Sequence, residues 1–530
     1  MKGKIKILSV ILLLLVAGVY YYVTLPAVNI HATGFWTFII SLIVICMAYY
    51  VLRKKIPLTE LKQSKTLKVM LGVLLLVVVV YLGGSILSSP IVNAGKYQKL
   101  LTVDNGEFTT DVQEVSYNQI PLLDKESASL LGNRKMGSMI DMASQFEVDE
   151  IYSQINYNDK PVRVSPLKYA SAIKWITNQS KGIPAYIMID MATQTTELVK
   201  LDQGIKYSVS EYFNRNIYRH LRFNYPTYIF SDLSFEIDED GVPYWVCPVK
   251  KFNIGLFGGA TIGRVVLCNA ITGETVDYAI EDVPEWIDRA YSPELLIQLY
   301  DYHGTLKHGF INSVLAQKDC LVTTDGYNYL AIDDDVWVYT GVTSVSGDES
   351  NVGFVLMNSR TMETKFYKVE GATEFSAMES AEGQVQNLKY RATLPLLLNI
   401  SGEPTYFIAL KDDAGLVKKY AMVNVQKYQV VGIGDTVSDC EEEYQELLLK
   451  EGIQKIEDTR EIETITGAIT KIAQGVVEGN SHYYIMVEGS KDIFDISVVD
   501  YLDIIRYEVG DKITMEYKVD TRANVVLSIK

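Results

Sequence analysis

The hydrophobic pattern divides the chain into an apolar N-terminal part and a longer part in which short apolar runs alternate with turns. Three uncharged apolar runs of 19 residues open the sequence, at 7–25, 34–52 and 69–87. Each run is long enough to cross the hydrocarbon core of a bilayer as a helix. The pattern therefore predicts three transmembrane helices within residues 1–90.

The distribution of lysine and arginine predicts how these helices are oriented. Lys2, Lys4 and Lys6 precede the first run, further basic residues fill 53–68, and no charged residue separates the first run from the second. Under the positive-inside rule, the N-terminus and the second loop are cytoplasmic, and the chain after Leu87 is extracytoplasmic. A cleaved signal peptide in place of the first helix is the alternative, and it would leave the large region on the same side.

A short pattern of glycine, proline and an aromatic residue recurs three times in the longer part. The copies are Gly182-Ile-Pro-Ala-Tyr-Ile, Gly241-Val-Pro-Tyr-Trp-Val and Gly402-Glu-Pro-Thr-Tyr-Phe. Glycine accepts the positive φ of a tight turn, and proline is tolerated where a strand begins. The pattern predicts a turn followed by a strand at each copy, as in a repeated structural unit.

The residues around the second copy have a recognisable order of elements. We expect a helix over 212–223, a strand over 233–237, a hairpin opened by Gly241, and a closing turn at Thr272-Gly273-Glu274. This order resembles the PepSY type of domain, which occurs in secreted and membrane-attached bacterial proteins. The first copy follows a helix expected over 168–177, and the third, at 379–425, lacks the closing Thr-Gly turn.

The predicted fold class is α+β, with the repeated helix-plus-antiparallel-sheet units between the transmembrane helices and a small OB-like β-barrel. The strands expected between the second and third units should extend the same sheet. The expected divisions are transmembrane helices 1–90, connector 91–165, first unit 166–210, second unit 211–300, β-rich segment 301–372, third unit 373–439, acidic helical linker 440–460 and barrel 461–530.

Charge limits the choice of partners. The first 90 residues hold 9 basic residues and 1 acidic residue, so of 49 Lys/Arg and 65 Asp/Glu, 40 and 64 lie in the remainder, which carries a formal charge of −24. Such a surface repels nucleic acid. The expected partners are the lipid bilayer and a protein of the envelope, with no nucleic acid.

Sequence signatures of catalysis are missing, and we expect no catalytic residue, metal or cofactor. The best candidate binding residues are Trp286, Asp288, Arg289 and Tyr291. Two aromatic residues flanking an arginine can form a recognition patch, with Asp288 orienting the guanidinium. In the alternative interpretation, the aromatic residues pack the following helix on the sheet and Asp288 and Arg289 form a surface pair.

Two cysteines in the central hairpin are candidates for a disulfide. Cys247 and Cys268 flank the segment 256–259 almost symmetrically, so a turn at Gly258-Gly259 would place them opposite one another. The alternative is a pair of buried free thiols. Trp245 should project to the same face as Cys247 and be buried with it.

These features favour a membrane-anchored, non-catalytic scaffold or regulatory binding protein on the outer face of a cell envelope, as the PepSY resemblance implies. Two alternatives stay open. One is an envelope hydrolase with an unrecognised site, and the other is a structural subunit whose sheets form a homo-oligomer interface.

Overall fold

The computed structural model describes residues 2–113, 120–121, 123–332, 335–345, 350–453, 462–477, 480–499, 501–518 and 523–530. The fold is mixed α+β, as the sequence predicted. The chain divides into two compact units, Met1–Leu448 and Leu449–Lys530.

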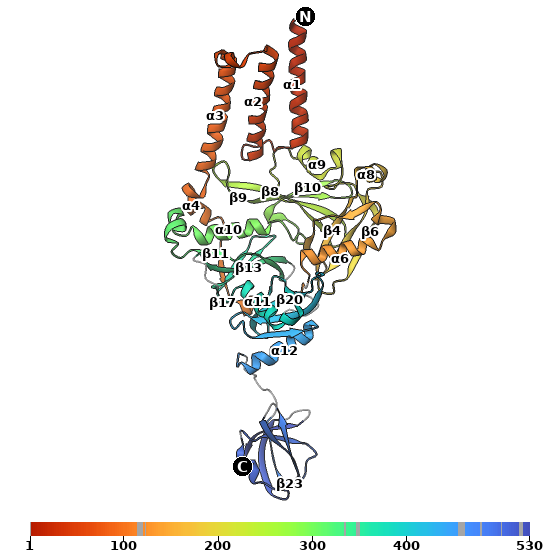
Figure 1. The fold of residues 1–530 in the computed structure, drawn as a ribbon, viewed down its shortest axis with the longest axis vertical. Helices are drawn as coiled ribbons and strands as arrows, with labels where there is room; N and C mark the ends of the chain where they lie inside the picture. Colours follow the sequence, from red (N-terminus) through yellow and green to blue (C-terminus); the bar gives the residue numbers. More distant parts are fainter. Residues whose placement is uncertain are drawn as a thin grey trace. The chain divides into compact units, whose positions relative to one another are not determined.

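The three apolar runs form helices α1 (Lys2–Thr24), α2 (Thr33–Lys54) and α3 (Lys65–Leu87), drawn in red at the N-terminal end of Figure 1. Among the described residues, α2 and α3 are long and apolar enough to cross a membrane, and the apolar part of α1 is shorter. Helix α4 (Pro90–Gln98) follows α3 after a break.

The first sheet has the strand order β2-β4-β5-β6, with β3 also paired to β4. Its elements are α6 (Lys125–Gly137), α7 (Ile140–Ala143), β2 (Phe146–Val148), β3 (Ser153–Asn156), β4 (Pro161–Tyr169), α8 (Ala172–Asn178), β5 (Ile183–Asp190) and β6 (Thr196–Ile205). Strands of this sheet therefore begin within the expected connector. The helix expected over 168–177 begins later, because β4 continues through Tyr169.

The second sheet follows the order of elements expected from the sequence. Helix α9 (Ile217–Asn224) precedes an antiparallel meander in the order β10-β9-β8-β7. The strands are β7 (Ser234–Ile237), β8 (Pro243–Ile254), β9 (Gly258–Asn269) and β10 (Thr275–Ala279).

The expected turn of the central hairpin was wrong. Ile254 pairs with Gly258, so the chain reverses through residues 255–257, and a bulge after Val249 shifts the register. Cys247 consequently faces Val266, and Cys268 faces Trp245. The two cysteines are not cross-strand partners.

Strands after the second unit form a separate sheet, which corrects the expectation that they would extend the same one. The order is β1-β16-β15-β13-β11, with β12 also paired to β13. The elements are β1 (Asp104–Gly106), α5 (Phe108–Asp111), α10 (Pro293–Thr305), β11 (Leu321–Thr323), β12 (Asn328–Ile332), β13 (Asp335–Ser344), β15 (Gly353–Asn358) and β16 (Thr364–Tyr367). Strands β14 (Ser350–Asn351) and β17 (Gly371–Ala372) pair with each other in a small two-stranded sheet.

The reason for a second layer lies in β8 and β9, which are buried on both faces. Trp245 and Cys247 contribute to the core shared with the first sheet, whereas Val246 and Val265 pack in a core with α10 and β13. A sheet with two apolar faces needs a covering layer on each.

The third unit has strands in the order β18-β20-β21-β22, with β19 also paired to β20. The elements are α11 (Glu374–Gln384), β18 (Arg391–Ala392), β19 (Leu396–Ile400), β20 (Glu403–Lys411), β21 (Val417–Asn424), β22 (Val431–Gly434) and α12 (Val437–Lys450).

Helix α12 covers residues 440–450 of the acidic segment 440–460 that was expected to be a linker, and it packs on the third unit; residues 454–460 lie outside the described residues. Cys440, Tyr444 and Leu448, four residues apart, are buried on one face of this helix. The hydroxyl of Tyr444 lies 2.9 Å from the Thr405 hydroxyl of β20. The apolar stripe therefore fixes the helix to the sheet, despite the acidic residues between its members.

The C-terminal unit contains the small barrel that the sequence predicted. Its described strands close in the order β23-β24-β25-β27-β26. They are β23 (Ile462–Val477), β24 (Asn480–Val487), β25 (Phe494–Ser497), β26 (Lys512–Lys518) and β27 (Asn524–Ile529). The barrel interior has its own core, which includes Ile485, Phe494 and Met515.

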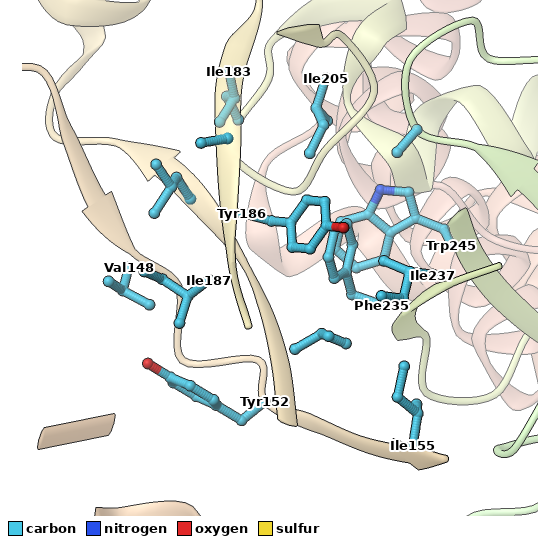
Figure 2. Packing of buried hydrophobic residues seen from close by; sticks show 14 of the residues in the cluster. Val148, Tyr152, Ile155, Ile183, Tyr186, Ile187, Ile205, Phe235, Ile237 and Trp245 are labelled. Carbon is cyan, nitrogen blue, oxygen red and sulfur yellow. The ribbon is translucent and has the colours of Figure 1, made fainter. Parts of the chain in front are cut away.

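All three repeated glycines adopt positive φ, at 80° for Gly182, 78° for Gly241 and 76° for Gly402. A strand begins within two residues after each glycine, as predicted. The aromatic residues of the copies, Tyr186, Trp245 and Tyr406, are fully buried. The first two meet at Phe235, whose ring centroid lies 6.0 Å from that of Tyr186 and 5.5 Å from that of Trp245 (Figure 2).

Candidate functional site

A cavity of about 390 Å³ lies where the first sheet, the sheet built on β13 and the third unit meet. We call it the arginine pocket, because Arg163 and Arg289 both line it. The other lining residues are Pro121, Leu123, Asp124, Lys125, Tyr152, Glu294, Tyr327, Asn328, Tyr329, Thr393, Leu394, Leu396, Phe407 and Ala409.

Arg163 stands in the middle of β4 and is 6% exposed. Its Nε donates to the carbonyl of Leu123 and its Nη2 to the side-chain oxygen of Gln154, each at 3.2 Å. Burial lowers the pKa of Arg163 to about 10, and the positive charge of Arg289 acts in the same direction. The guanidinium stays charged at neutral pH, held in place by two uncharged acceptors.

Arg289 follows the second sheet and is half-buried. Its guanidinium carbon lies 5.9 Å from the centroid of the Tyr329 ring. Tyr329 and the carboxylates of Glu236 and Glu294 raise the pKa of Arg289. A second cation therefore lines the cavity that Arg163 enters from β4.

The two carboxylates of the pocket already have partners. Lys411 pairs with Asp124, which also accepts from the amide of Ser127 at 2.8 Å. The hydroxyl of Tyr327 donates to Glu294 at 2.9 Å. Neither carboxylate forms an ion pair with Arg163 or Arg289. Among the described arginines, those that pair with an acid are Arg264, Arg360, Arg391 and Arg506.

The buried carboxylate of Glu236 fixes the backbone of the segment 286–291, which contains Arg289. Glu236 of β7 is fully buried and accepts from the Ser234 hydroxyl at 2.7 Å and the Asp288 amide at 3.0 Å. Burial raises the pKa of Glu236, against these hydrogen bonds. The segment that carries Arg289 is thus anchored to the second sheet.

The four predicted binding residues occupy different environments. Trp286 packs against Tyr244 with ring centroids 5.3 Å apart, and Tyr291 is buried with its hydroxyl 3.5 Å from the carbonyl of Ile262. Asp288 is 1% exposed and accepts from the amide of Asn156 at 2.7 Å. Of these four residues, Arg289 lines the arginine pocket. A binding role for the other three stays a prediction.

Cys247 and Cys268 are free and buried. Burial raises the pKa of the Cys268 thiol to about 12 and that of Cys247 well above its usual value. Both thiols lie in the core beside Trp245, which is buried with Cys247 as expected. They contribute to packing, in agreement with the free-thiol alternative.

Sequence reasoning missed Arg163, although the sequence contains a signal for it. The residue interrupts the apolar strand sequence Pro161-Val-Arg-Val-Ser-Pro-Leu167 between two valines. A charged residue inside a strand that is buried on both faces needs a partner or a site. Only the tertiary structure brings it to the same cavity as Arg289.

Comparison with protein-family models finds no match for this chain, and a search of curated proteins finds none either.

Proposed function

We propose that this chain is a membrane-anchored binding protein of a bacterial cell envelope, with a large extracytoplasmic region that acts as a non-catalytic scaffold or regulator. One observation carries the proposal. The end of α1, the start of α2 and the end of α3 all meet the same part of the second unit, formed by α9, the residues after it and the β8–β9 hairpin.

The connection from α1 to α2 is held against the residues that follow α9. Arg222 donates through Nε to the carbonyl of Leu25 at 3.0 Å. The amide of Val28 donates to the carbonyl of Pro226 at 2.8 Å. The guanidinium of Arg219 lies 4.6 Å from the ring centroid of Tyr22 in the last turns of α1.

The hairpin turn makes the remaining contacts. The ring of His31, just before α2, bonds through Nδ1 to the carbonyl of Leu256 at 2.7 Å. After α3, the Ser88 hydroxyl accepts from the amides of Leu256 and Phe257, at 2.8 and 3.2 Å. The β8–β9 hairpin thus contacts both the connection before α2 and the residues after α3.

These contacts support the three-span topology predicted from charge. The helix ends at Thr24, Thr33 and Leu87 face the large folded region that follows α3, which we call the body. The opposite ends of the helices are then the N-terminus and the basic segment 53–68. Positive residues favour the cytoplasmic side, so the body lies outside. The lipid bilayer is then the first partner of this chain.

The binding role is supported by the way the chain uses its repeated units. Their aromatic residues are buried in cores, so the units act as a scaffold, and the arginine pocket lies at their junction. The PepSY resemblance implies a protein partner in the envelope, and the closed barrel has the strand number of an OB-type domain. The alternatives remain an envelope hydrolase and a homo-oligomeric structural subunit.

Protease added to intact spheroplasts tests the topology. We expect the region after Leu87 to be digested from outside, while an epitope placed before Lys2 is cut only after lysis. Protection of the large region in intact spheroplasts would contradict the proposal. For the binding role, we expect a discrete envelope protein to copurify in detergent at fixed stoichiometry, and a self-associated mass with no second protein would favour the structural alternative.

A further inference from the structure

We propose that the arginine pocket binds a small organic anion, whose single carboxylate or phosphate group lies between Arg163 and Arg289. This inference goes beyond the proposed function, because it assigns a ligand class to a pocket and does not depend on membrane topology.

Arg163 and Arg289 share one cavity and have no ion pair with a described residue, although the region after residue 90 is rich in acids. After residue 90, acidic residues outnumber basic ones by 64 to 40. Other arginines use this excess, as Arg360 does with two hydrogen bonds of 2.7 and 2.8 Å to Asp335. Neither Arg163 nor Arg289 has such an ion pair with a described residue. Arg163 is 6% exposed and bonds two uncharged acceptors, and burying a charge without a countercharge is costly. An anion in the cavity would supply the missing countercharge.

The donor geometry suits an oxyanion. A guanidinium carries five N–H groups in a planar fork that matches a carboxylate or phosphate. Two of these groups on Arg163 hold Leu123 and Gln154, which fixes the plane of the fork. The remaining N–H groups of Arg163 and the side-chain donors of Arg289 form no hydrogen bond to a described residue, so they are available to a ligand.

Arginine suits this position better than lysine would. The orientation of Arg163 is set by two bonds on one side of the guanidinium, so ligand binding loses little side-chain entropy. Arg289 is held through its backbone by Glu236 and lies over Tyr329. The pocket is thus preorganised for a charged group at one position.

The other residues that line the pocket indicate that the ligand has an apolar organic part beside its anionic group. Leu123, Leu394, Leu396 and Phe407 supply aliphatic and aromatic surface, together with Tyr329. A volume of about 390 Å³ is within the range of small-molecule sites. A bare inorganic ion would leave this apolar wall without a contact.

The two carboxylates in the wall limit the ligand to one anionic group. Asp124 and Glu294 are held by Lys411 and Tyr327, and they face the same cavity as the arginines. A second anionic group on the ligand would approach one of them and be repelled. We therefore expect monocarboxylates or phosphate monoesters to bind better than dicarboxylates.

Thermal unfolding of the full-length chain in detergent tests the proposal, with benzoate, phenyl phosphate and benzyl alcohol as probes at matched ionic strength. Ligands that bind the folded state raise the melting temperature by mass action. We expect a saturable rise with benzoate, phenyl phosphate or both, and none with the neutral alcohol. The two anions distinguish a carboxylate site from a phosphate site.

Variants locate the binding. Arg289→Gln and Arg163→Gln should each weaken the apparent affinity about tenfold or more, through loss of charge-assisted hydrogen bonds. Arg391→Gln, which removes an exposed arginine paired with Glu382, should leave the affinity unchanged. If Arg163→Gln does not fold, the affinities of Arg289→Gln and Arg163→Lys are compared with that of the parent. Lysine keeps the positive charge of Arg163 but lacks the planar guanidinium.

Three results would overturn the proposal. They are no saturable shift with either anion, an equal shift with benzyl alcohol, and an anion shift that persists in Arg289→Gln. None of these results bears on the spheroplast experiment, so failure of this inference is distinguishable from failure of the proposed function.

Discussion

The hydroxyl of Tyr186 donates a 3.0 Å hydrogen bond to the carbonyl of Gly241. The aromatic residue of the first repeated copy is thereby joined to the turn glycine of the second. Tyr186 is 1% exposed, and burial raises the pKa of its phenol. The repeated pattern thus provides an interface between consecutive units as well as their turns.

Replacing Tyr186 by Phe removes this bond while keeping the ring against Phe235. We expect a loss of about 0.5–1.5 kcal/mol in the free energy of unfolding, typical of one hydrogen bond. Denaturation of the chain in detergent, followed by tryptophan fluorescence, measures it. Tyr212→Phe, at an exposed ring, is the control and should be close to neutral; equal losses in both variants would refute the role of the bond.

Replacing Trp245 by Ala should be far more damaging. The indole is fully buried, packs on Phe235 and donates through Nε1 to the carbonyl of Tyr207 at 2.8 Å. Truncation of such a core residue costs about 3–5 kcal/mol. Trp245→Phe should recover part of the packing. An Ala variant that melts like the parent but loses a partner would mean that this tryptophan acts in recognition.

Glu236 should make the stability of the region after α3 depend on pH. Burial raises its folded-state pKa above the usual 4.5, so the folded chain holds a proton that the unfolded chain releases. This contribution is complete below the unfolded pKa, and it is lost as the pH rises through the folded pKa.

Glu236→Gln can keep both hydrogen bonds, because its amide accepts from the Asp288 amide and donates to Ser234. The stability difference, parent minus variant, should therefore decrease as the pH rises from about 4.5, by at most about 1.4 kcal/mol per pH unit. Urea titrations across this range measure the difference. A constant difference would show that Glu236 titrates normally.

Gly258 marks a close approach between the hairpin and the end of α3. A Cβ added there would lie 2.1 Å from the carbonyl oxygen of Ser88 and 2.5 Å from the Tyr97 hydroxyl. Gly258→Ala should cost about 1–3 kcal/mol as overpacking and should increase proteolysis near residue 88. Gly95→Ala, where no atom lies within 4 Å of the added Cβ, is the matched control. If the two variants behave alike, the contact has no energetic weight.

The C-terminal barrel should fold without the rest of the chain. Leu449–Lys530 is a separate compact unit, and its strands close on their own core. Residues 461–530 expressed alone should give a cooperative melt and dispersed amide resonances. An unfolded product would show that the barrel depends on the preceding unit.

The sequence by itself determined the local features of this protein. The apolar runs specified helices, and the three Gly-x-Pro copies specified turns and strands, because positive φ and a strand start are properties of individual residues. The acidic helix and the closing barrel were also visible as helical and strand patterns.

The tertiary structure alone decided how these elements combine. The chain reverses through residues 255–257 and not at Gly258-Gly259, so the symmetric spacing of Cys247 and Cys268 did not make them partners. The buried apolar stripe of α12 packs this helix on the third unit, although its acidic composition had suggested a linker. Arg163 and Arg289 are 126 residues apart in the chain, and they line one cavity because separate sheets pack together there. Local patterns are encoded by neighbours in the sequence, whereas register, layer stacking and pockets depend on contacts between distant segments.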